Sequence, residues 1–196
     1  MNIKDCKAII ILFAPGQGGN HLANIISTSP YVENRMLSDD YNKDLEFYYR
    51  SNNKNAHLPG GIDNVGVMDV EGLQDTLMKS KKTYVIAGHI DETYYIYEYI
   101  KNLGSYIFIT FENFNLTESI KKRMKTYDES LIKLLYRKTI VSKLFDTDNV
   151  MTLDPAKLFD EDPHDLFIDL SRELSLDLDL DFCMNLHKLW YKKINK

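Results

Sequence analysis

Cysteine and proline are scarce in this chain of 196 residues, which has two Cys and five Pro. Cys6 and Cys183 stand near opposite ends of the sequence, and neither has a second cysteine or a pair of histidines at the spacing of a metal site. This distribution excludes a disulfide framework and a zinc module, so no metal is expected. It favours a reducing environment, and we expect the protein to be cytoplasmic.

The chain also lacks a basic excess and a long hydrophobic run. Lys and Arg total 24 against 29 Asp and Glu, a net charge of −5, which argues against general nucleic-acid binding. The N-terminal apolar run, residues 8–14, is too short to span a bilayer and leads into glycines, so we expect neither a membrane segment nor a targeting segment. Hydrophobic residues make up 44% of the chain, enough for the core of one globular domain.

Short apolar runs alternate with amphipathic segments along the chain. Runs typical of buried strands cover 8–14, 83–88, 106–111 and 149–153. Amphipathic segments that favour helices cover 21–27, 70–80, 92–103, 116–125, 128–144, 163–174 and 179–194. This alternation predicts a single-domain α/β fold over 1–196, with a mainly parallel sheet of about four to five strands flanked by helices. Residues 30–66 are expected to form a long irregular excursion, and 163–194 a helical C-terminal part.

The first strand is followed by a glycine-rich turn, Pro15-Gly16-Gln17-Gly18-Gly19-Asn20-His21. In a parallel sheet, ligands bind beyond the carboxyl ends of the strands, and the N–H groups at a helix N-terminus favour a phosphate or sulfate. The clustered glycines therefore indicate an anion cradle, with an ordinary strand-to-helix turn as the alternative. The turn is not a Walker A loop because it has no Lys-Ser/Thr pair, and it is not G-x-G-x-x-G because His21 occupies the third glycine position.

Two other strand ends carry candidate residues. His89 directly follows the strand 83–88, where a neutral imidazole can act as a general base, and a structural histidine is the alternative. Beyond the strand 106–111, Ser119 and Arg123 fall in a predicted helix whose hydroxyl and basic groups are suited to a second phosphate. A solvated basic helix face is the alternative there.

These three elements together resemble the sulfotransferase family of P-loop-like α/β enzymes, which use 3′-phosphoadenosine 5′-phosphosulfate as the sulfuryl donor. Pro15 and Gly18 fall at the matching places of the family's first signature, so the resemblance implies that residues 15–21 cradle the 5′-phosphosulfate in a three-layer, P-loop NTPase-like sandwich. His89 matches the acceptor-activating histidine, and Ser119 matches the serine on the 3′-phosphate, with Arg123 as a further candidate. The pattern is most similar to compact members encoded by phages, which would place the protein in the cytoplasm of the host cell.

The chain departs from this family at two basic positions. Gly16 stands where the family commonly has a lysine, and Phe111 where it has a phosphate-binding arginine. The expected function is transfer of a sulfuryl group to a hydroxyl or amine of a small-molecule or carbohydrate acceptor, without a metal. A non-catalytic nucleotide-binding or interaction protein that kept the fold, and a P-loop nucleotide kinase, are the alternatives. The sequence defines neither the acceptor nor an oligomeric state.

Overall fold

The elements of the fold follow the alternation seen in the sequence. The computed structural model describes residues 2–13, 18–32, 61–62, 77–78, 81–88, 101–102, 104–111 and 149–195. A short 3-10 helix, η1 (Ile3–Asp5), leads into β1 (Cys6–Leu12), which is followed by α1 (Gly19–Ile26). The remaining strands and the C-terminal helices are β2 (Gly61–Ile62), β3 (Tyr84–Gly88), β4 (Ser105–Phe111), β5 (Val150–Leu153), α8 (Pro155–Leu158), α9 (His164–Leu174) and α10 (Leu180–Ile194).

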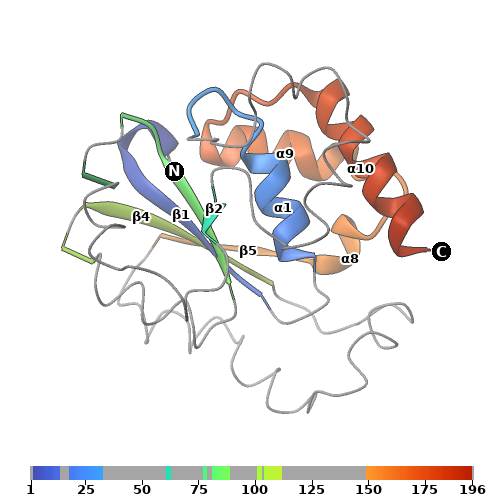
Figure 1. Ribbon diagram of the computed structural model, residues 1–196, viewed down its shortest axis with the longest axis horizontal. Helices are drawn as coiled ribbons and strands as arrows, with labels where there is room; N and C mark the ends of the chain where they lie inside the picture. The colour runs from blue at the N-terminus through green and yellow to red at the C-terminus, as the bar shows by residue number, and fades with distance from the viewer. Residues whose placement is uncertain are drawn as a thin grey trace, which may run out of the picture.

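The strand β1 is the centre of a five-stranded sheet with the order β2-β3-β1-β4-β5, in which every pairing is parallel (Figure 1). In register, Ile10 lies between Ile86 of β3 and Phe108 of β4. All residues from Ala8 to Leu12 are completely buried, as expected for a central parallel strand, which has no face toward water. The predicted α/β fold with a mainly parallel sheet is confirmed.

The strand order puts β1 at a switch point of the sheet. The chain leaves β1 toward the side of β3 and β2, whereas it leaves β4 toward β5 on the other side. In open parallel sheets, such a reversal leaves room for a ligand outside the carboxyl ends of the two neighbouring strands, here β1 and β4. The helix α1 begins at this carboxyl edge and packs on β1 and β3.

The described helices lie on one side of the sheet. Figure 1 shows α1 next to the sheet with α9 and α10 outside it, and α10 packs on both α1 and α9. None of the helices in the described part of the chain is long and apolar enough to cross a membrane. Of the helices predicted at 92–103, 116–125 and 128–144, on which the second helical layer of a three-layer sandwich depends, only residues 101 and 102 are described, and they form a turn.

The predicted bounds agree closely with the observed elements. The strand β1 begins and ends two residues before the predicted run 8–14, and α9 and α10 each begin one residue after the predicted starts. Besides η1, two short elements are not predicted. One is β2, which lies within the expected irregular excursion and pairs with β3. The other is α8, whose N-cap Asp154 accepts a hydrogen bond from Ala156 N–H (2.9 Å) where the sequence indicates only a strand end.

The fold makes a direct prediction for Gly19, the first residue of α1. A Cβ at this position would lie 2.1 Å from Cδ1 and 2.2 Å from Cγ of Phe13, so alanine requires the ring to move. Alanine favours a helix over glycine by roughly 0.5–1 kcal/mol, but forcing extra volume into a packed core costs about 1–3 kcal/mol. Gly19→Ala should therefore lower the free energy of unfolding in a urea titration.

The companion change Phe13→Leu tests whether the Phe13 ring causes the loss of stability in Gly19→Ala. If the ring is what opposes the new methyl group, the double variant should recover part of the loss caused by Gly19→Ala, because the two substitutions are coupled. A Gly19→Ala protein as stable as the original would show that the ring does not confine this position.

Candidate functional site

The turn between β1 and α1 ends in glycines that the fold itself requires. Gly18 has a φ of 80°, in the left-handed region, and is the N-cap of α1. A Cβ there would lie 3.0 Å from Leu158 and 3.4 Å from the rings of Phe159 and Trp190. Backbone conformation and close packing therefore account for Gly18, as the neighbouring ring accounts for Gly19.

Gly18 also leaves the start of α1 without a side-chain cap. The first hydrogen bond of the helix runs from the Leu22 N–H to the Gly18 carbonyl (2.9 Å). The N–H groups of the first turn have no acceptor further back in the helix, and the positive end of the helix dipole lies with them. An anion at the carboxyl edge of β1 would meet favourable charge here.

The side chain of His21 is buried rather than directed into open space. It is 2% exposed, and its ring stacks on the indole of Trp190 with the ring centroids 4.2 Å apart and the planes 5° from parallel. Its Nε2 lies 3.2 Å from Nδ1 of His187, another α10 residue. The imidazole of His21 therefore fixes the C-terminal helix to the β1–α1 turn.

The hydrogen bonds of the two histidines define their tautomers. Nε2 of His187 lies 2.8 Å from the carbonyl oxygen of Asp160, which can only accept, so this nitrogen carries a proton. In neutral His187, Nδ1 is then the acceptor, and Nε2–H of His21 donates to it. The buried pair is satisfied when both rings are neutral.

Burial opposes the charged form of both histidines. Burial and the neighbouring His187 hold the pKa of His21 well below its usual range. Burial also lowers the pKa of His187, against the opposing effects of the Asp160 carbonyl and of the Asp160 and Asp162 carboxylates. Protonation of either ring therefore costs free energy in the folded protein.

The end of β4 is apolar in the position where the sulfotransferase pattern has its arginine. Phe111 is completely buried and pairs in register with Leu153 of β5. Beside it, Thr110 and Thr152 are also register partners, and their hydroxyls are buried without a hydrogen-bond partner among the described residues. Phe111 thus belongs to the core, and no cation reaches the carboxyl edge from this position.

Several predicted site residues lie outside the described residues, namely Pro15, Gly16, Gln17, His89, Ser119 and Arg123. Asn20 lies in the first turn of α1. The residue before His89, Gly88, ends β3 and pairs with Leu12 at the end of β1. The described structure therefore brings Gly18, Gly19, Asn20 and His21 together at the carboxyl end of β1, and the roles of the others stay predictions.

His187 and Trp190, which pack against the start of α1, are not among the predicted site residues. The amphipathic C-terminal segment indicates a docked helix, and both residues lie three positions apart on one face of it. Their partners at the start of α1, Gly18 and His21, are more than a hundred and fifty residues away in the sequence, and the pair His21–His187 is separated by 166 positions. Only the folded chain shows that this helix covers the β1–α1 turn.

Comparison of the chain with models of protein families, with curated proteins and with solved structures found no match in any of the three. In the described part of the chain, no group of three or more His, Cys, Asp or Glu side chains is arranged to hold a metal ion. The geometry of the β1–α1 turn is therefore the basis for assigning a function.

The buried histidine pair predicts an acid-dependent loss of stability. Each folded-state pKa is depressed, so the unfolded chain binds protons first as the pH falls. Above the pKa of a histidine in the unfolded chain, about 6.5, the pair leaves the free energy of unfolding unchanged. Below that pH the free energy of unfolding declines, by about 1 kcal/mol for His21 between pH 6.5 and 5.5. Urea unfolding across this range measures the slope.

His21→Phe should reduce that slope, because phenylalanine keeps an aromatic ring against Trp190 and cannot be protonated. His164→Phe is the matched control, since the His164 side chain is 49% exposed on α9. An equal pH slope in the original protein and in His21→Phe would show that the pair does not stay neutral in the folded state.

Proposed function

We propose that the protein is a sulfotransferase-like enzyme that binds 3′-phosphoadenosine 5′-phosphosulfate at the carboxyl edge of its sheet. The observation that carries this proposal is the glycine-capped turn from β1 into α1 at the switch point of a parallel sheet. The residues Gly18, Gly19 and Asn20 would offer backbone N–H groups to the 5′-phosphosulfate. The imidazole of His21 would support the turn from behind through its contacts with α10.

The proposed reaction is a direct transfer of the sulfuryl group. An acceptor oxygen or nitrogen attacks the sulfur, the bond from sulfur to the 5′-phosphate oxygen breaks, and 3′-phosphoadenosine 5′-phosphate leaves. His89 takes the proton from the acceptor hydroxyl or amine, and Ser119 with Arg123 holds the 3′-phosphate. Such a transfer depends on positioning and on stabilisation of charge, which backbone amides supply without a metal.

A second candidate, a non-catalytic nucleotide-binding protein, is favoured by the state of Phe111. This side chain is completely buried, so the arginine of the family pattern is replaced by a core residue. A protein that lacks this cation can keep the fold and lose the transfer reaction. Binding of the product nucleotide without any transfer to acceptors would favour this candidate.

The donor site is tested by calorimetric titration with 3′-phosphoadenosine 5′-phosphate. We expect micromolar binding that is lost in the double variant Ser119→Ala/Arg123→Ala, because both groups that hold the 3′-phosphate are removed. The control Ser105→Ala/Arg172→Ala changes the same residue types at exposed positions and should bind as before. Absence of binding would overturn the proposal, and binding of ATP with magnesium instead would favour a kinase.

The catalytic role of His89 is tested separately from donor binding. His89→Ala should lower the rate of sulfuryl transfer by roughly 100- to 10,000-fold, the usual contribution of a general base, and leave nucleotide affinity unchanged. His164→Ala is the control for loss of a histidine elsewhere. Equal transfer rates for the original enzyme and His89→Ala would exclude this role.

A further inference from the structure

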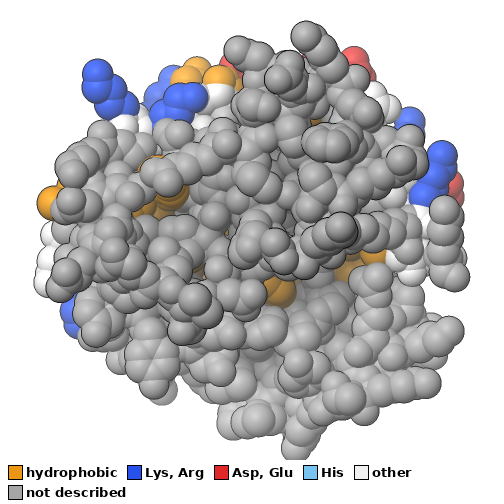
Figure 2. All heavy atoms as spheres, viewed as in Figure 1, with side chains coloured by type: hydrophobic (Ala, Val, Ile, Leu, Met, Phe, Trp, Pro, Cys, Tyr) orange, Lys and Arg blue, Asp and Glu red, His pale blue; other side chains and the backbone are white. Residues whose placement is uncertain are grey.

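The opposite edge of the sheet, where the strands begin, contains a basic pocket. Its volume is about 390 Å³, within the range of small-molecule sites, and it is formed by η1 and the start of β1, by the turn after α1 and by residues 81–83, just before β3. Figure 2 shows Lys and Arg side chains gathered at the upper left, over the region where Figure 1 places the starts of β1 and β3.

Four lysines and one aspartate line this pocket, Lys4, Lys7, Lys81, Lys82 and Asp5. The local excess of positive charge contrasts with the net charge of −5 of the chain. In the described part of the chain, no ion pair joins Lys4, Lys7 or Lys81 to an acidic residue. Like charges gathered in a concave site create a potential that attracts anions.

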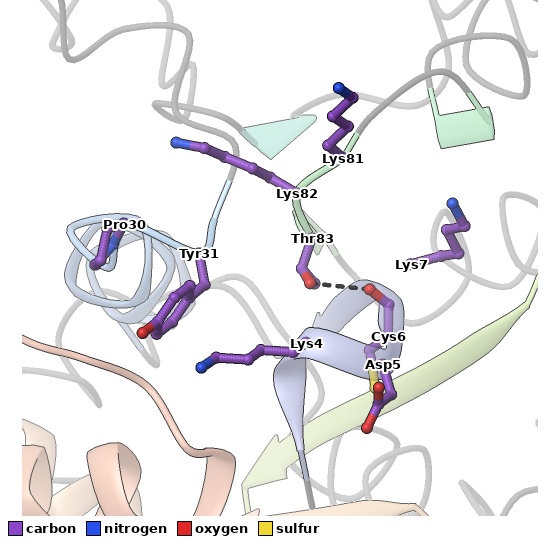
Figure 3. A pocket seen from close by; sticks show the side chains of 9 residues that line it. All are labelled: Lys4, Asp5, Cys6, Lys7, Pro30, Tyr31, Lys81, Lys82 and Thr83. Atoms are coloured by element: carbon purple, nitrogen blue, oxygen red, sulfur yellow. Dashed lines mark hydrogen bonds between the residues drawn. The ribbon is translucent and has the colours of Figure 1, made fainter.

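Two of the lysines lie on the Tyr31 side of the pocket, and Lys7 and Lys81 extend away from it (Figure 3). The ammonium of Lys4 lies 4.2 Å from the centre of the Tyr31 ring, a cation–π contact, and Figure 3 shows Lys4 and Lys82 both extending toward the side of the pocket that Tyr31 occupies. Asp5 lies away from that side, next to Cys6. Burial and Asp5 raise the pKa of the Cys6 thiol, so the thiol adds no negative charge near neutral pH.

Thr83 holds the walls of the pocket together. Its buried hydroxyl shares its one proton between the carbonyl oxygens of Ile3 (2.8 Å) and Cys6 (2.9 Å), and its N–H donates to the Tyr31 carbonyl (3.1 Å). Three segments distant in the sequence are thereby fixed to one another. These hydrogen bonds hold the walls in place, which lowers the entropy cost of ordering them on binding.

We propose that this pocket binds a small ligand with two or more phosphate groups. The charge of a diphosphate complements the lysines, whose ammonium groups act as point charges for phosphate oxygens. The partly buried Tyr31 ring, with the Lys4 ammonium over one face, adds an aromatic side chain beside them for contact with the base of a nucleoside diphosphate. This site is separate from the proposed donor site, because parallel strands place their starts and their ends at opposite edges of the sheet.

Pyrophosphate titration of the full chain by calorimetry tests the proposal. We expect binding that weakens with added salt and falls at least tenfold in Lys4→Gln/Lys81→Gln. Lys157→Gln/Lys188→Gln removes the same charge from exposed positions outside the pocket and should bind like the original protein. Absence of binding, or equal binding by the two double variants, would overturn the proposal.

Amide chemical shifts locate the bound anion independently of the variants. Pyrophosphate should move the signals of Tyr31 and Thr83, whereas exclusive shifts at Gly18 and Gly19 would place it at the carboxyl edge and refute the amino-edge site. Titration with ADP distinguishes a nucleoside diphosphate from an inorganic diphosphate as the ligand. Tighter binding of ADP than of pyrophosphate, reduced by Tyr31→Leu, identifies a nucleotide, and equal binding identifies the phosphates alone.

Discussion

The contact between Trp190 and the β1–α1 turn is the interaction on which the carboxyl edge of the sheet depends. The indole stacks on His21 and closes over Gly18, so the end of β1, the start of α1 and the C-terminal helix form one packed unit. A side chain at Gly18 would separate these parts, and a charge on His21 would have to be buried between them. The C-terminal helix thus packs directly against Gly18 and His21, beside the donor site that we propose.

The two edges of the sheet offer different chemistry to anions. At the carboxyl edge, the described groups are backbone amides at the start of a helix. The end of β4 adds no cation there, because its last residue is the buried Phe111. At the amino edge, the described groups are lysine ammonium groups that line a pocket together with Tyr31. Amides preorganised by the fold suit a group whose charge changes during a reaction, whereas clustered lysine ammonium groups suit attraction of a charged ligand.

Much of the fold can be predicted because buried parallel strands have continuous apolar sequences, such as Ile9 to Leu12. The strand β2 has only two residues, Gly61 and Ile62, and so carries no periodicity. The position of the glycine-rich turn is predictable for the same reason as the strand before it. The structural reason for a glycine at position 18 cannot be predicted, because the residues that confine it belong to the distant α8 and α10 regions. A tertiary contact leaves no local signal in the sequence.

A crystal structure of the protein with bound 3′-phosphoadenosine 5′-phosphate would test the central claim most directly. We expect the 5′-phosphate against the backbone N–H groups of Gly18 and Gly19, with the stack of His21 and Trp190 intact behind them. Nucleotide bound only in the lysine pocket around Tyr31, or a carboxyl edge left empty at saturating nucleotide, would contradict the assignment of the donor site.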